Sequence, residues 1–156
     1  MRWGAILVAM GVLLLAGCGG GKAGGGVERS KAWSLHVIGG QVTLKRSTGN
    51  LALNVLSGRP SDLAMSCRSD GRFLVRIETR PETAGMTVEL SAGGRTVSLS
   101  KGERGIDEAV LALLSSDQRI SVKAGDIALG PFDPPFDQVT DELVGQCRKW
   151  MKAVKG

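Results

Sequence analysis

The chain has 156 residues, 22% of them charged, and a formal net charge of +5 at pH 7. This length suits a single domain. The mild basic excess is typical of a solvated surface, and the alternative is attraction to anionic envelope surfaces such as lipid headgroups. Tyrosine is absent and aromatic residues make up only 4% of the chain, which argues against sites that stack sugars or nucleobases. We therefore expect no nucleic-acid partner.

An apolar run occupies residues 5–15 and follows one basic residue, Arg2. Its length of about ten residues is that of the apolar part of a signal peptide, and it is too short for a bilayer-spanning helix, which needs roughly 20 residues. The run ends in the tetrapeptide Leu15-Ala16-Gly17-Cys18. This ending resembles the lipobox of bacterial lipoproteins. The alternative is an ordinary secretory leader that contains an incidental cysteine.

The lipoprotein resemblance implies a defined processing of the N-terminus. The signal peptide, residues 1–17, is removed, the thiol of Cys18 is joined to diacylglycerol, and the new amine is acylated. Residues 18–30 then form the lipidated cysteine and a glycine-rich tether, and residues 31–156 form one domain. The next residue is Gly19 and not aspartate, which in lipoproteins of enterobacterial type implies transfer to the outer membrane, facing the periplasm.

Two further cysteines, Cys67 and Cys147, would lie in an oxidising compartment after export. Two thiols permit one intramolecular pairing, so we predict a Cys67–Cys147 disulfide. Two buried free thiols, or a covalent link to a partner protein, are the alternatives.

Apolar and polar residues alternate over most of the region from 33 to 99, as expected of half-buried strands. Turns rich in glycine interrupt this alternation. The pattern predicts short strands around residues 33–37, 42–45, 51–55, 63–67, 73–77, 86–90 and 97–99. Short strands with frequent turns are typical of an antiparallel β-sandwich or a strongly curved sheet.

The spacing of apolar residues changes after residue 105. Intervals of three and four predict a short helix over 106–114, and strands are expected at 119–123 and 126–129. Regular secondary structure is not expected in the next segment, which contains Pro131, Pro134 and Pro135. A final helix is predicted over 137–154. Its apolar face is formed by Val139, Leu143, Cys147, Trp150 and Val154.

Periodicity places both cysteines toward the core, with Cys67 on the inward face of a strand and Cys147 on the apolar face of the last helix. A bond between them would pin this helix across the sheet. The predicted fold class is therefore mainly β with two helices: an antiparallel β-sandwich packed by a C-terminal helix, with one disulfide.

The sequence contains no recognisable catalytic arrangement. His36 is the one histidine, and no Gly-x-Ser-x-Gly motif accompanies it. The carboxylate pairs Asp107-Glu108 and Asp141-Glu142 fall in the first turns of predicted helices, where negative charge stabilises the helix. We expect no catalytic residue, no metal site and no cofactor, and therefore a protein that is not an enzyme.

One surface feature is a candidate binding site for anions or a partner. Arg72, Arg76 and Arg80 share the outward face of a strand, and Arg68 lies nearby. Guanidinium groups in such a row can bind phosphate or an acidic protein. The alternative is a solvated row that Glu78 and Glu89 neutralise in part by cross-strand pairing.

The chain order from residue 63 onward resembles that of a known group of exported proteins. It consists of Ser66-Cys67-Arg68 on a strand, Gly71-Arg72-Phe73, the helix over 106–114, Arg119-Ile120-Ser121-Val122, and a last helix with Cys147-Arg148-Lys149-Trp150. This order is similar to that of TagO-like proteins associated with type VI secretion, and more loosely to that of invasion-associated locus B proteins. The resemblance implies a small exported β-sandwich with a strand-to-helix disulfide, and it supplies no catalytic residue.

These observations predict a lipid-anchored, non-enzymatic binding or accessory module of the bacterial envelope. Its expected partners are the membrane, through the acyl chains, and a protein or an anionic envelope component. A role beside a secretion apparatus and inhibition of a periplasmic hydrolase are alternative functions. An envelope enzyme with an unrecognised site is a further alternative.

Overall fold

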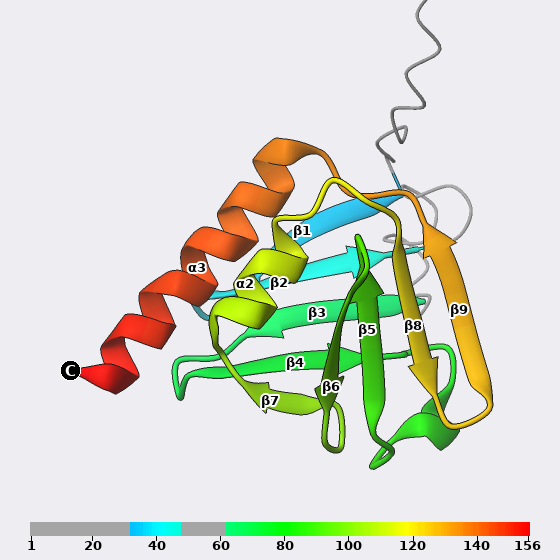
Figure 1. Ribbon diagram of the computed structural model, residues 1–156. Coiled ribbons are helices and arrows are strands. Elements are labelled where there is room, and N and C mark those ends of the chain that lie inside the picture. Colours follow the sequence, from blue (N-terminus) through cyan, green and yellow to red (C-terminus); the bar gives the residue numbers. More distant parts are fainter. Residues whose placement is uncertain (1–31, 48–61) are drawn as a thin grey trace, which may run out of the picture.

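The computed structural model describes residues 32–47 and 62–156 (Figure 1). The predicted signal peptide, Cys18, the tether and the strand expected at 51–55 lie outside the described residues. Within them, nine strands form two antiparallel sheets, and two α-helices pack with these sheets.

The first sheet has the order β1-β2-β3-β4-β7, and every neighbouring pair of strands is antiparallel. Its strands are β1 (Trp33–Ile38), β2 (Gln41–Arg46), β3 (Leu63–Cys67), β4 (Arg72–Arg76) and β7 (Glu103–Gly105). The sequence predicted the first four but not β7, which has no apolar residue to reveal its periodicity.

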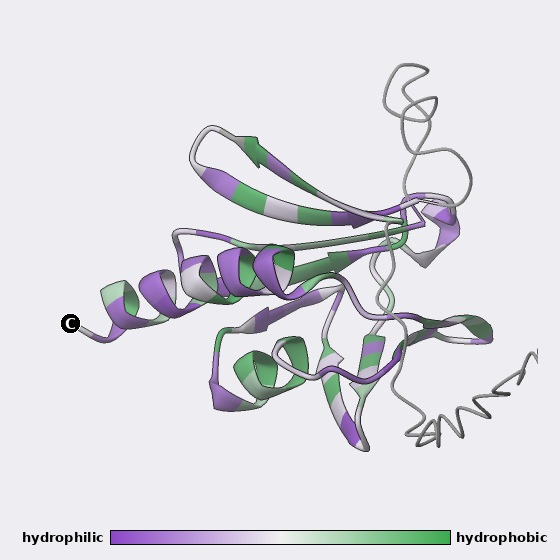
Figure 2. Cartoon of the chain, turned by 90° about the horizontal axis from the view of Figure 1, so that it is seen from above, coloured by the Kyte–Doolittle hydropathy of each residue, from purple (hydrophilic) through white to green (hydrophobic). Residues whose placement is uncertain are grey.

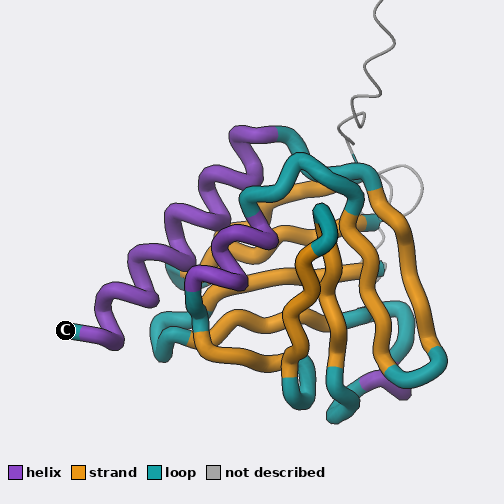
Figure 3. Tube along the Cα trace, in the orientation of Figure 1, coloured by secondary structure: helices purple, strands orange, loops and turns teal. Residues whose placement is uncertain are grey.

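The second sheet has the order β6-β5-β8-β9 and is also antiparallel. Its strands are β5 (Val88–Ala92), β6 (Arg95–Leu99), β8 (Ile120–Ala124) and β9 (Ile127–Phe132). The strands of this sheet cross in front of those of the first sheet (Figures 1 and 3). The predicted fold class is confirmed: mainly β, with two antiparallel sheets, a C-terminal helix and one disulfide.

The core lies between the two sheets, because alternation along each strand turns its apolar side chains to one face. Leu44, Met65 and Val75 are register neighbours across the first sheet, and all three are buried. Leu90 and Val122 are paired in the second sheet and are equally buried. Burying each such side chain contributes roughly 1.5–3 kcal/mol.

The helices α2 (Glu108–Leu114) and α3 (Asp137–Lys155) complete the core. α3 packs on β2 and β3, and α2 lies against α3, β5 and β6. Figure 2 shows the short helix as mostly hydrophobic, whereas α3 carries alternating hydrophilic and hydrophobic stripes. The amphipathic pattern predicted for the last helix therefore matches its position at the edge of the core.

The buried stripe of α3 differs in part from the predicted one. Leu143 and Cys147 are buried as predicted, and Val144 and Met151 join them. Val154, however, is 59% exposed. The residue next to it is Gly71 of the β3–β4 hairpin, which has no side chain that could cover it.

Two further expectations were wrong. Met86 is 40% exposed and precedes β5, because the chain at Gly85 adopts a positive φ of 85° and turns before the strand begins. Pro131 lies within β9 and not in an irregular segment. β9 is an edge strand of its sheet, and one side of an edge strand needs no backbone N–H donors.

Candidate functional site

The four arginines of the predicted row are exposed, but they do not form one continuous site. Arg72 is the first residue of β4 and Arg76 the last. Arg68 lies in the β3–β4 hairpin, and Arg80 immediately precedes the short 3-10 helix η1 (Pro81–Thr83). The row is thus two pairs, one at each end of β4.

Carboxylates neutralise the pair at the hairpin end. The Nη2 atom of Arg68 lies 2.9 Å from Oδ2 of Asp70, and Nη1 of Arg72 lies 2.9 Å from Oε2 of Glu103. Glu103 is also 3.7 Å from Arg68. Since both arginines already have an acidic neighbour, this end of β4 offers little unpaired positive charge.

Glu78 and Glu89, the expected partners of the row, interact elsewhere. The Glu78 carboxylate binds Nζ of Lys45 at 3.1 Å. Glu89 lies on β5 in the second sheet, where its register neighbour is Lys123 of β8. Only the Arg68–Arg72 end of the row is neutralised, by Asp70 of the hairpin and by Glu103 of β7, because β7 and not β5 is the strand that pairs with β4.

The pair at the other end of β4 retains its charge. Within the two described ranges, no carboxylate lies within ion-pair distance of Arg76. Arg80 has a long contact of 3.9 Å to Glu82, and both of these side chains are more than half exposed. An exposed pair of this kind contributes little, so Arg80 remains able to bind another anion.

A pocket of about 490 Å³ lies beside Arg76 and Arg80. Its walls are the end of β4, the segment around η1 and the turn between β6 and β7. A third cation, Lys101, lines it from this turn. Its apolar lining includes Ile77, Pro81 and Val88. This volume lies in the range of small-molecule sites, so the pocket combines room for a ligand with three cations.

Two acidic residues also line the pocket, and each is bound to a cation. Glu78 pairs with Lys45, as described above, and Glu103 pairs with Arg72. Their charges are therefore largely offset, and the three pocket cations give this region a positive character.

The sequence did not single out Lys101. It lies with Gly102 in a tight hairpin turn, and both residues have positive φ angles, 54° and 73°. The one available signal was a lysine and a glycine between strand residues, which marks a turn but says nothing about the pocket beneath it.

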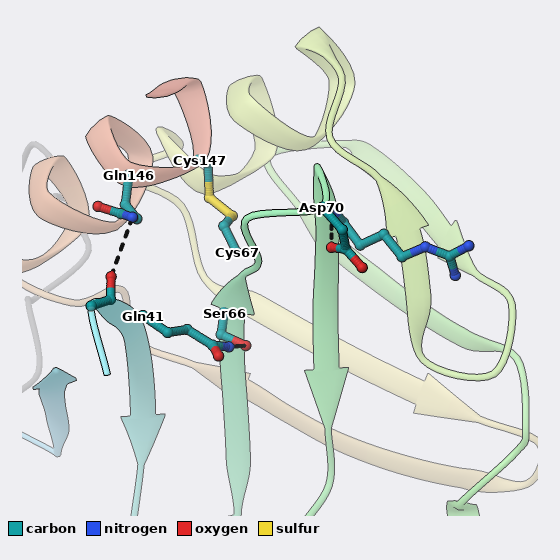
Figure 4. Close-up of a disulfide and its surroundings, with 8 residues drawn as sticks. Gln41, Ser66, Cys67, Asp70, Gln146 and Cys147 are labelled. Atoms are coloured by element: carbon teal, nitrogen blue, oxygen red, sulfur yellow. Dashed lines mark hydrogen bonds between the residues drawn. A yellow bond between two sulfur atoms is a disulfide. The ribbon is translucent and has the colours of Figure 1, made fainter. Parts of the chain in front are cut away.

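The predicted disulfide is confirmed. Cys67 on β3 and Cys147 on α3 are bonded, and both are fully buried (Figure 4). Beside the bond, Nε2 of Gln146 donates a hydrogen bond of 3.4 Å to the carbonyl of Gly40 in the β1–β2 turn. These two links join α3 to the first sheet.

His36 lies half-buried on β1, and its Nε2 atom is 2.9 Å from Oγ of Ser34. The Ser34 hydroxyl is also 3.5 Å from the carbonyl of Lys45. Ser34 and His36 alternate with Trp33 and Leu35, which pack in or against the core, so the two polar side chains lie on the other face of β1. The histidine is therefore part of a local polar contact on β1.

Asp107 caps α2, as predicted for the pair Asp107-Glu108. Its Oδ1 accepts a hydrogen bond of 2.9 Å from the backbone N–H of Val110. Burial tends to raise the pKa of this carboxyl, but hydrogen bonds from Arg104 and Val110 and the Arg104 charge together lower it below its ordinary value. The second pair, Asp141-Glu142, is exposed one turn inside α3, because this helix begins at Asp137.

Among the described residues, no group of three or more His, Cys, Asp or Glu side chains is arranged to hold a metal ion. None of the helices in these ranges has the length and hydropathy needed to cross a bilayer. Comparison with known proteins gave no match: no family model, no curated protein and no solved structure is significantly similar to this chain. The resemblances inferred from the sequence therefore stay predictions.

Proposed function

We propose that this chain is a lipid-anchored binding module of the bacterial envelope. Acyl chains on Cys18 hold it at the periplasmic side of the outer membrane, and the domain binds an anionic partner and catalyses no reaction. The tetrapeptide Leu15-Ala16-Gly17-Cys18 supports the anchor, as it resembles a lipobox at the end of a short apolar run.

The Cys67–Cys147 disulfide supports an exported location. Disulfides persist in oxidising compartments such as the periplasm and are rare where thiols are kept reduced. Both sulfur atoms lie in the core, so the bond belongs to the folded domain and not to a reactive surface site.

The binding role rests on the unpaired charge at the end of β4. Arg76 has no carboxylate partner in the described part of the chain, and Arg80 has only a distant, exposed one. Arg68 and Arg72 carry the same side chain at the other end of the row but are neutralised. An anionic partner would therefore bind at the Arg76–Arg80 end.

Crosslinking in the native envelope tests this function with the full chain. In the parent chain we expect a crosslinked product that decreases at high salt, because salt screens exposed charges. The double variant Arg76→Gln/Arg80→Gln should lose this product, because each substitution removes a cation that can bind the partner. The matched variant Arg95→Gln/Arg148→Gln removes the same charge from exposed positions outside the pocket lining and should retain the product. Equal yields from both variants would contradict the proposal.

A further inference from the structure

Lys101 has an unusual backbone conformation. In the described part of the chain it is the one non-glycine residue with a left-handed φ, 54°. Two-residue hairpin turns of this kind favour glycine, asparagine or aspartate, because at positive φ a Cβ atom crowds the following carbonyl oxygen and only short polar side chains offset this strain by local hydrogen bonds. A lysine at this position is therefore not explained by the turn itself.

Gly102, the next residue, fixes the backbone conformation of this turn. Gly102 has a φ of 73°, and a Cβ atom on it would lie 2.7 Å from the carbonyl oxygen of Val75. The Gly102 carbonyl also accepts a hydrogen bond of 2.9 Å from the Val75 N–H. The turn is thus held tightly on β4, and Lys101 is held in its strained conformation with it.

The position of Lys101 supplies a reason for keeping a lysine there. It lines the 490 Å³ pocket together with Arg76 and Arg80. Strained residues that persist in a fold are concentrated at binding and catalytic sites. The strain and the pocket are independent observations, and both direct attention to the same side chain.

The charges of the pocket select the ligand. Its two carboxylates are bound to Lys45 and to Arg72, which leaves three cations for a bound anion. Three cations match a doubly charged group better than a single carboxylate, and a phosphate monoester carries about −1.5 to −2 at pH 7. The apolar lining offers an additional surface for the organic part of such a molecule.

We propose that this pocket binds a small organic phosphate monoester. Lys101, Arg76 and Arg80 bind the phosphate, and the apolar portion lies against Ile77, Pro81 and Val88. This inference rests on the proposed function, because it names the class of ligand that the proposed binding module binds. It does not depend on the lipid anchor.

Calorimetric titration of the full-length chain in an uncharged detergent tests the proposal, with phenyl phosphate, inorganic phosphate and phenol as probes. We expect phenyl phosphate to bind at least about tenfold more tightly than inorganic phosphate, because only the ester uses both parts of the pocket. Phenol should show no measurable binding.

Variants of Lys101 separate charge from strain. Lys101→Asn and Lys101→Gln should both weaken phenyl phosphate binding by about tenfold or more, since both lose the ammonium group. Only Lys101→Asn should also raise the Tm, by roughly 2–4 °C, because asparagine adopts positive φ more readily than lysine, whereas glutamine does not. The control Arg95→Gln removes an exposed cation at the start of β6, outside the pocket lining, and should leave binding unchanged.

Three outcomes would overturn the inference: no binding of phenyl phosphate, unchanged binding in both Lys101 variants, or the same loss in Arg95→Gln. An envelope crosslink that depends on Arg76 and Arg80, together with no phenyl phosphate binding, would leave the proposed function standing and would reject this ligand.

Discussion

Cys67 and Cys147 are 80 residues apart in the sequence, and their Cα atoms lie 5.2 Å apart across the disulfide. The bond joins the third strand of the first sheet to the last helix, and Figure 4 shows Gln146 reaching the β1–β2 turn beside it. The C-terminal helix is therefore held to the sheet by a covalent bond as well as by packing.

Loss of this bond should strongly destabilise the domain. Closing a loop of this length contributes about 4–5 kcal/mol in the chain-entropy treatment, a large share of the roughly 5–15 kcal/mol that stabilises a typical domain. We expect Cys67→Ala/Cys147→Ala to unfold at a much lower urea concentration than the oxidised chain. The control Gln146→Ala removes only the neighbouring hydrogen bond and should cost about 1 kcal/mol or less. Equal midpoints for the double variant and the parent would contradict the role of the bond.

The cap on α2 should make stability depend on pH. Because the folded pKa of Asp107 is lowered, its ionised form contributes stability that is present above its unfolded pKa and is lost as the pH falls through the folded value. Asp107→Asn should remove this contribution while keeping a side chain that can cap the helix. The free energy of unfolding of the variant should therefore fall less steeply than that of the parent below about pH 4. Parallel curves in urea titrations from pH 2.5 to 7 would show that Asp107 has no such role.

Two glycines separate the effect of backbone conformation from that of crowding. Gly94 and Gly102 both have a φ of 73°, but a Cβ on Gly94 would meet nothing within 4 Å, whereas one on Gly102 would meet the Val75 carbonyl at 2.7 Å. We expect Gly94→Ala to cost about 1 kcal/mol from conformation alone. Gly102→Ala should cost at least about 1–3 kcal/mol more, since the turn must move off β4. Similar unfolding free energies for the two variants, measured by urea denaturation, would contradict the close approach of Gly102 to the Val75 carbonyl.

Arg46 connects the two sheets near one end of the core. Its guanidinium carbon lies 3.9 Å from the centre of the Phe132 ring on β9, and its Nη1 is 2.8 Å from Oδ2 of Asp62. A double-mutant cycle with Arg46→Met and Phe132→Leu should give a coupling energy of about 1 kcal/mol, because the pair is largely shielded from water. Strictly additive losses of stability would show that the stacking contributes nothing.

Much of the fold was predictable because strand alternation is a local property. The inward positions of Leu44, Met65 and Cys67 follow from period-two spacing alone, and the position of Cys147 follows from helical spacing. The same spacing puts Arg46 in phase with Val42 and Leu44, on the buried face, although nothing nearby in sequence identifies its partner Phe132.

Other features depend on contacts between distant segments. β7 could not be recognised, because three residues with no apolar member show no period and gain their structure from pairing with β4. That pairing also places Glu103 beside Arg72. The sequence alone therefore could not distinguish the neutralised Arg72 from Arg76, which has no such partner in the described ranges. Lys101 was missed for the same reason: its importance comes from the pocket formed with Arg76 and Arg80.

The mass of the intact protein, purified from the envelope under non-reducing conditions, tests the central claim most directly. We predict a chain that begins at Cys18, carries acyl chains on that residue, and weighs two hydrogens less than its reduced form because of the Cys67–Cys147 bond. A chain that retains residues 1–17, or that begins elsewhere without lipid, would contradict the anchored binding module proposed above.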